Sequence, residues 1–216
     1  MMRTFSPATL IVSLMCVLVL HPVTSSAQII DRVLASVGGR IVTASDVRMA
    51  REFGLVQVRG MTATDPQMIL ERLVNRMLVL DEVGRYAPPE PAERDVKERF
   101  DVLRARFETS DAFAAAMRLT GVDEATLMQW VRNDLRIRAY LDQRFAGVVE
   151  PSGADLENYV RQIRANAAKS GRTMEDDEVT RLAREQAVAD RRQALIQEWI
   201  EGLRRRAAIS YTQAEF

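Results

Sequence analysis

The side chains that carry most enzymatic chemistry are scarce in this sequence. Of 216 residues, one is histidine, His21, and one is cysteine, Cys16. If the segment holding both is removed as a leader, the remaining chain has neither imidazole nor thiol. Thiolate nucleophiles, histidine bases and metal sites with histidine or cysteine ligands are then excluded. Carboxylate, serine, lysine and tyrosine chemistry stays open.

The acidic run Glu175-Asp176-Asp177-Glu178 is a candidate cation site. Carboxylates bind Ca²⁺, but the EF-hand spacing with its loop glycine does not surround this run. Acidic residues in the first turn of a helix are favoured by the helix dipole, and this interpretation explains the run better. The chain also has no Gly-x-Ser-x-Gly elbow, P-loop or Rossmann motif. We therefore expect no catalytic residue, no metal, no small-molecule cofactor and no enzyme activity.

The charge balance argues against nucleic acid as a partner. Lys and Arg number 30 and Asp and Glu number 30, so the formal net charge is zero, whereas phosphate backbones are bound by an excess of cations. Two arginine-rich stretches, 204–206 and 132–138, can attract anionic lipid or an acidic client. Because acidic residues stand close to both, a solvated helix face is the favoured interpretation.

Residues 1–27 have the three parts of a secretory signal peptide. Arg3 supplies the positive start, an apolar run covers 10–20, and small residues precede a cleavage site after Ala27. The run is shorter than the ~20 residues of a membrane span, although an uncleaved N-terminal anchor is the alternative. The sequence predicts an exported protein that folds without disulfides, so its stability must come from its core.

The rest of the chain predicts a mainly α fold with a small β element. A β-hairpin is expected over 31–43, with Gly38-Gly39 as its turn. Helical patterns follow almost throughout, and residues 208–212 form a candidate third strand that pairs with the hairpin. The expected helices cover 45–56, a segment starting at Pro66 after the cap Asp65, 92–107, 112–119, a segment from the cap Asp123 to 145, 154–168 and 176–207.

Four segments resemble the SurA-type periplasmic chaperones in their order along the chain. Residues 30–47, IDRVLASVGGRIVTASDV, are similar to the family's first strands and their entry into helix 1. Residues 69–80 look like its second helix, and 121–136 are similar to its G-x-(S/D) stretch that ends here in VRNDLR. Residues 192–211 look like the C-terminal helix and closing strand. The resemblance covers most of the chain after the leader, except about 150–190.

The chain departs from SurA where parvulin prolyl isomerase domains are expected. The corresponding stretch here is short, polar and free of histidine, so isomerase activity is expected to be absent. After the signal peptide predicted at 1–27, the resemblance implies a chaperone module at 28–216. Within the module, 28–149 hold the hairpin and first helices, 150–175 a helical insert, and 176–216 the long helix and closing strand.

The resemblance implies a periplasmic, ATP-independent holdase for unfolded, outer-membrane proteins, with an outer-membrane assembly machine as a further partner. The alternative is a non-enzymatic adaptor or structural subunit of a cell-envelope complex. Terminal strands and long amphipathic helices also permit a homodimer formed by swapping.

The client-binding residues we predict are apolar and rich in methionine, because methionine adapts to many partners. They are Phe53, Leu55, Met61, Met117, Leu119 and Met128. The competing interpretation is that residues at helical spacing belong to the core, and it is favoured for Met68, Met77 and Trp130.

Overall fold

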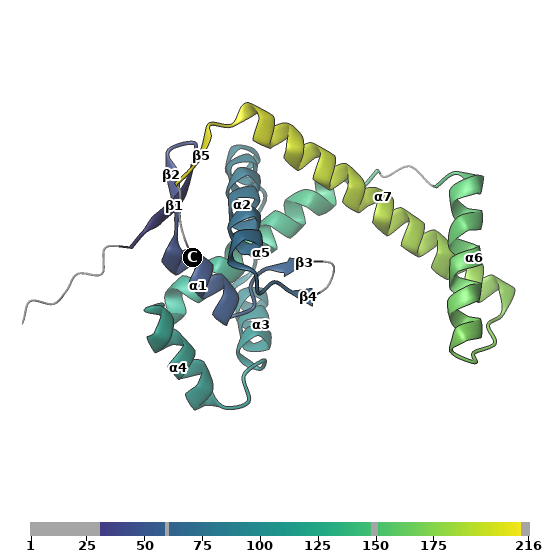
Figure 1. Ribbon diagram of the computed structural model, residues 1–216, viewed down its shortest axis with the longest axis horizontal. Helices are drawn as coiled ribbons and strands as arrows, with labels where there is room; N and C mark the ends of the chain where they lie inside the picture. The colour runs from purple at the N-terminus through teal and green to yellow at the C-terminus, as the bar shows by residue number, and fades with distance from the viewer. Residues whose placement is uncertain (1–30, 59–60, 148–150, 213–216) are drawn as a thin grey trace, which may run out of the picture. The chain divides into compact units, whose positions relative to one another are not determined.

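The computed structural model describes residues 31–58, 61–147 and 151–212. The predicted signal peptide lies outside the described residues. The described chain is mainly α, as predicted, with a small antiparallel sheet that joins both ends of the chain (Figure 1).

The sheet has the strand order β2-β1-β5. β1 (Val33–Val37) and β2 (Arg40–Thr43) form the predicted hairpin, and β5 (Ile209–Tyr211) pairs antiparallel with β1. The turn residues Gly38 and Gly39 have φ values of 57° and 85°, which only glycine adopts without strain. The predicted third strand is therefore confirmed.

Helix α1 (Ala44–Glu52) follows the hairpin directly and is held there by a capping box. The Thr43 side chain accepts a hydrogen bond from the Asp46 N–H, and the Asp46 carboxylate accepts one from the Thr43 N–H. The helix ends four residues before the predicted Val56, because Gly54 takes a left-handed φ of 58°. A two-stranded ribbon of β3 (Gln57–Val58) and β4 (Met61–Thr62), which was not predicted, follows this turn.

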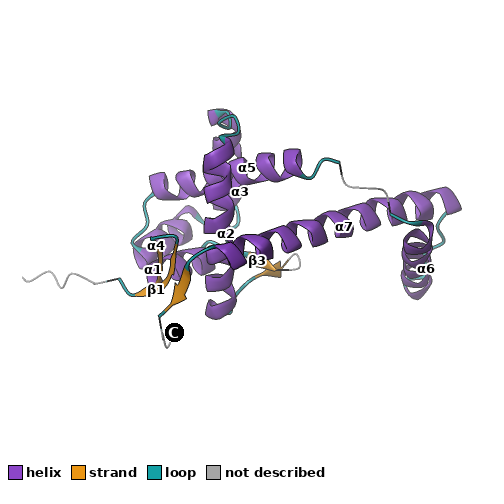
Figure 2. Ribbon diagram, turned by 90° about the horizontal axis from the view of Figure 1, so that it is seen from above, coloured by secondary structure: helices purple, strands orange, loops and turns teal. Residues whose placement is uncertain are grey.

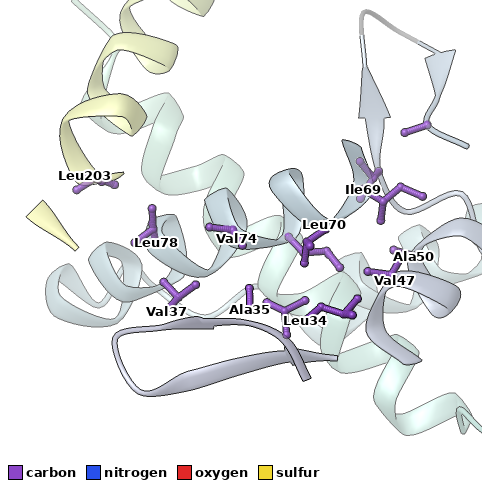
Figure 3. Packing of buried hydrophobic residues seen from close by; sticks show 14 residues of the cluster. Leu34, Ala35, Val37, Val47, Ala50, Ile69, Leu70, Val74, Leu78 and Leu203 are labelled. Atoms are coloured by element: carbon purple, nitrogen blue, oxygen red, sulfur yellow. The ribbon is translucent and has the colours of Figure 1, made fainter. Parts of the chain in front are cut away.

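Helix α2 (Pro66–Tyr86) is the central element. Asp65 caps it by accepting from the Gln67 N–H at 2.9 Å, as predicted. Its apolar side chains pack beneath β1 and beside α7, as Figure 3 shows for Leu70, Val74 and Leu78 against the hairpin. The expectation that Met68 is core is wrong: its side chain is 42% exposed, on the side of α2 away from the packed residues.

Three further helices build a second part of the core. They are α3 (Glu93–Arg104), α4 (Ser110–Thr120) and α5 (Glu124–Arg144). α3 packs on α5, and α4 packs on α1. Asp123 caps α5 by accepting from the Thr126 N–H at 2.8 Å, as predicted.

The last two helices are α6 (Gly153–Lys169) and α7 (Asp176–Arg206), which pack against each other (Figure 2). The first half of α7 buries Val179, Ala183 and Ala187, whereas no residue of α6 is fully buried. The acidic run 175–178 lies at the start of α7, as the helix-dipole interpretation predicts. The second half of α7 packs on α2 through residues such as Leu203.

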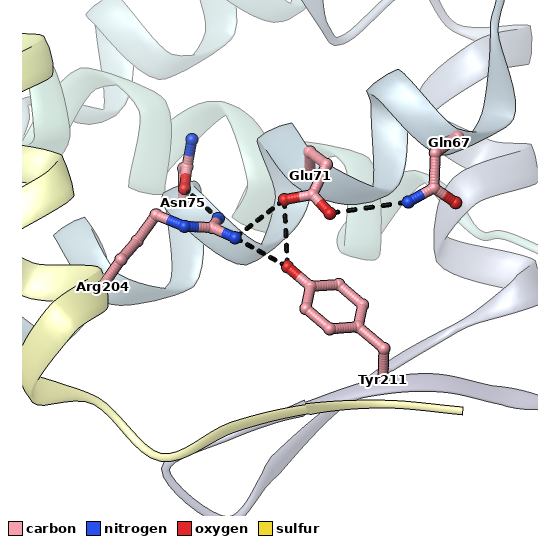
Figure 4. Close-up of polar contacts among 5 residues, drawn as sticks. All are labelled: Gln67, Glu71, Asn75, Arg204 and Tyr211. Carbon is pink, nitrogen blue, oxygen red and sulfur yellow. Dashed lines mark hydrogen bonds and ion pairs between the residues drawn. The ribbon is translucent and has the colours of Figure 1, made fainter. Parts of the chain in front are cut away.

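A polar cluster closes the fold where α7 meets α2 and β5 (Figure 4). Arg204 donates to Asn75 at 2.7 Å, to Glu71 at 2.9 Å and to the Tyr211 hydroxyl at 2.8 Å. Tyr211 in turn donates to Glu71 at 2.9 Å. The solvated-face interpretation is therefore wrong for Arg204, although Arg205 and Arg206 are exposed.

None of the helices in the described ranges combines the length and hydropathy that crossing a membrane requires.

Candidate functional site

Four phenylalanines meet in one aromatic cluster: they come from the C-cap of α1, from α3, from the turn after α3 and from α4. The ring of Phe113 lies 5.7 Å from that of Phe53, 6.0 Å from that of Phe100 and 5.3 Å from that of Phe107. All three contacts are edge-to-face, the arrangement that aromatic quadrupoles prefer. Phe113 thus fixes α4 to the rest of the protein.

Helix α4 has little other anchoring. Of its 11 residues only Phe113 and Thr120 are buried. Thr120 donates its hydroxyl hydrogen to carbonyls of α4 itself, so it adds no tie to another element. Ala116 and Met117 pack on the aromatic cluster but are only partly buried, and a helix with one fully buried apolar side chain opens at lower free-energy cost than a helix buried along a full stripe.

Apolar side chains that are only half-buried surround this weakly held helix. Phe107, Met117, Val122 and Met128 all pack on the aromatic cluster and keep part of their surface in solvent. We refer to these four residues as the α4 surface. Two of them are methionines, whose flexible thioether side chains repack against differently shaped partners.

The structure brings together most of the predicted client-binding residues, but not all. Met117 and Met128 belong to the α4 surface, and Leu55 is half-buried where the two core clusters meet. Phe53 is 1% exposed, so it does not reach solvent and belongs to the buried cluster on which the α4 surface packs. Leu119 is 62% exposed but lies two positions from Met117, so it points away from that face. Met61 lies in β4, and its side chain is outside the described part.

A cleft of about 230 Å³ opens beside Leu55, between α3, α5 and the turn after α1. Its floor is apolar and includes Leu103, Val131 and Trp130. Its rim is charged and consists of Arg99, Arg106, Asp134 and Arg138. Sequence reasoning missed Arg99 and Arg106, because only the packing of α3 on α5 places them at a cleft.

The acid on this rim is already neutralised. Asp134 accepts from Arg76 at 3.2 Å and from Arg138 at 3.1 Å. Arg76 also stacks on Trp130, with its guanidinium carbon 3.9 Å from the ring centroid. Burial lowers the pKa of Arg76 from its ordinary value, and the Asp134 charge opposes this shift. The cleft thus combines an apolar floor with a surplus of positive charge.

The arginines at 132 and 136 also have structural partners. Arg132 pairs with Glu93 at 2.7 Å, and Arg136 pairs with Glu90 at 3.3 Å. Their side chains are 24% and 20% exposed, so they are less solvated than the sequence suggested. They join α5 to the start of α3.

Within the described ranges, no three residues among His, Cys, Asp and Glu come together in a way that could hold a metal ion.

Comparison with known proteins assigns the chain to no family. No family model and no curated protein matches it. A solved structure from work on PEB4 and Cj1289, two structurally related SurA-like chaperones of Campylobacter jejuni, covers 85% of this chain and 100% of its own. The sequence identity is 12% and the TM-score is 0.49.

Proposed function

We propose that this protein is an ATP-independent periplasmic holdase, which binds unfolded proteins through the α4 surface and releases them unchanged. The observation that carries the proposal is the half-buried, methionine-containing apolar surface around a helix anchored by Phe113. The SurA-type motifs quoted above from the sequence support it independently.

The chemistry of this surface suits weak, unselective binding. Each half-buried apolar side chain gains about 25 cal/mol for every Å² of surface that a client removes from water. A few such side chains give a modest affinity once the cost of ordering the client segment is subtracted. Weak binding lets a client leave without an energy source, so handover needs no nucleotide.

The proposed clients are unfolded outer-membrane proteins in transit through the periplasm, with an outer-membrane assembly machine as the receiver. The leader-like residues 1–27 support export, and the quoted motifs support this class of client.

The test is suppression of aggregation of several unrelated unfolded proteins, followed by light scattering. Met117→Gln and Met128→Gln keep side-chain length but make the α4 surface polar, so the double variant is expected to lose most of the protection. Met68→Gln is the matched control, because Met68 is exposed on α2 and outside this surface. Circular dichroism checks that all variants remain folded.

The outcomes separate a holdase from the alternative. Protection of several unrelated clients that falls in the double variant and not in Met68→Gln supports the holdase. No protection of any client, together with co-purification of one defined partner, supports an envelope adaptor and overturns the holdase.

A further inference from the structure

A second pocket lies far along the chain from the α4 surface, where α2 and α5 end. It has a volume of about 340 Å³ and is lined by Tyr86, Pro88, Tyr140, Gln143 and Arg144. Tyr86 is 64% exposed, and its ring lies 5.7 Å from that of Tyr140. Ala87, with a left-handed φ of 39°, ends α2 and turns the chain so that Pro88 is buried in the pocket wall. The pocket therefore offers an exposed aromatic ring above an apolar wall.

Among the described residues the hydroxyl of Tyr140 makes no hydrogen bond of acceptable distance and angle, although the Arg144 side chain lies close enough to oppose the rise of its pKa. The Tyr140 side chain is 5% exposed, and its hydroxyl oxygen is out of contact with solvent. Leaving a buried hydroxyl unsatisfied costs free energy, and native proteins seldom do so without a functional reason. Burial raises the pKa of Tyr140, so at neutral pH this hydroxyl keeps its hydrogen and can donate it.

The other polar groups of the pocket are also suited to a ligand that accepts hydrogen bonds. Among the described residues Arg144 forms no ion pair, and its guanidinium lies over the Trp199 ring, 5.1 Å from the centroid. The nearby acids are already paired: Glu82 with Arg85 at 2.8 Å, and Asp142 with Arg192. Gln143 adds an amide that can donate. Among the described residues no carboxylate lines the pocket, so these residues present donors and one positive charge.

We propose that the pocket of Tyr86, Tyr140 and Arg144 binds a peptide carboxylate that stands next to an apolar side chain. When the exposed Arg144 side chain turns from the Tyr140 hydroxyl toward the ligand, one carboxylate oxygen accepts from its guanidinium and the other from the uncovered hydroxyl, while the apolar side chain covers the Tyr86 ring. A carboxylate accepts a hydrogen bond from the Tyr140 hydroxyl and also balances the positive charge of Arg144. A neutral carbonyl accepts a hydrogen bond but does not balance the charge. The inference rests on the proposed function in one respect, that the peptide belongs to a client.

Three short acetylated peptides test the ligand chemistry: Gly-Ser-Gly-Phe with a free C-terminus, the same peptide as an amide, and Gly-Ser-Glu-Phe-Gly as an amide. Calorimetry measures affinity, and the fluorescence of Trp199, whose ring lies 5.9 Å from that of Tyr140, is a local readout. We expect the first or third peptide to bind and the amide without glutamate to bind at least tenfold more weakly. The stronger of the two binders identifies a chain end or an acidic side chain as the source. Equal binding of all three, or no binding, overturns the proposal.

The Tyr140→Phe variant tests whether the Tyr140 hydroxyl binds the ligand or only stabilises the fold. Because the hydroxyl is unsatisfied in the free protein, its removal is expected to leave the melting temperature unchanged or raised, and to weaken the best peptide roughly tenfold to a hundredfold. Arg144→Gln is expected to weaken the same peptide to a similar extent. Arg181→Gln on α7, which removes an exposed pair with Glu185, is the matched control and should bind normally. A large fall in melting temperature for Tyr140→Phe, or unchanged affinity in both pocket variants, contradicts the proposal.

The aggregation assay keeps this inference distinct from the proposed function. Tyr140→Phe should still protect clients, because the α4 surface is intact. A wild-type protein that binds the peptide carboxylate but protects no client would contradict the holdase and leave the carboxylate pocket standing. A protein that protects clients and binds none of the peptides would contradict the carboxylate pocket and leave the holdase standing.

Discussion

Nη2 of Arg204 lies 2.9 Å from Oε2 of Glu71, a residue 133 positions earlier in the chain. The pair joins the last turn of α7 to the central helix α2, and Tyr211 of β5 hydrogen-bonds to both partners. The side chains of Arg204 and Glu71 are 28% and 38% exposed, so water screens the pair only in part. Burial lowers the pKa of Arg204, but its contacts with Tyr211 and Glu71 outweigh this and raise it overall.

Arg204→Ala should therefore destabilise the fold. It leaves Glu71, Asn75 and the Tyr211 hydroxyl without their shared donor, and we expect a loss of about 1–3 kcal/mol in the free energy of unfolding. Urea denaturation followed by circular dichroism measures the loss. Arg205→Ala, at an exposed neighbouring position, should stay within about 0.5 kcal/mol of wild type. Equal effects of the two changes would show that the cluster adds nothing beyond a surface charge.

Phe113→Ala should release α4. The side chain is 5% exposed and fills the space between three other phenylalanine rings, so its loss is expected to cost about 3–5 kcal/mol. Hydrogen exchange of the α4 amides should accelerate more than that of α2. Leu119→Ala, on the same helix but 62% exposed, is the control and should change exchange little. Uniform acceleration across the whole protein would contradict the view that α4 is a separately opening element.

Stability should fall in acid partly because of Asp31. Burial raises the pKa of this carboxyl, but hydrogen bonds from Thr43 and Ser45 outweigh it and hold the pKa below its ordinary value of 3.8. A depressed pKa in the folded state stabilises the fold above pH 4, and this contribution is lost as the pH falls through 3.8 and below. Asp31→Asn should thus be less stable than wild type at pH 7, and the gap should narrow toward pH 3 in urea titrations. A gap that is constant with pH would contradict this role.

Ala183→Asp should separate α6 from α7. Ala183 is 0% exposed on the face of α7 that packs on α6, and a charge there has no partner. We expect the helical content measured by circular dichroism to fall while the fluorescence of Trp130, in the other part of the core, stays native when it is measured in a Trp199→Phe background. Glu185→Asp, at an exposed site on the same helix, should have no such effect. Loss of the Trp130 environment as well would show that the two regions unfold together.

The elements predicted correctly are those with a local physical cause. Gly38-Gly39 marks its turn because both residues need a positive φ, and Asp65 and Asp123 mark helix starts because their side chains accept from exposed N–H groups. The β3–β4 ribbon was missed because strands of two residues carry no periodic pattern.

Burial of individual side chains could not be predicted to the same degree. Phe53 was expected in a client groove but packs against the rings of Phe107, in the turn after α3, and Phe113, in α4, which come 50 or more positions later in the chain. Met68 lies one position from Ile69, which is 0% exposed, and the rotation of α2 against the sheet decides which of them faces solvent. The Tyr86–Tyr140 pocket exists only because α2 and α5 end side by side, and no sequence pattern records that meeting.

The pairing of β1 with β5 sets the order of events during folding. Val37 pairs with Ile209, so the sheet reaches its third strand only when almost the whole chain is available. Contacts of such long sequence separation form slowly, because the intervening loop must first be closed. If the protein is exported as proposed, a chain that leaves the export channel from its N-terminus can form the hairpin and helices early, but the sheet is complete only after residues 209–211 have emerged. Strand β5 thus makes completion of the sheet depend on the last described residues of the chain.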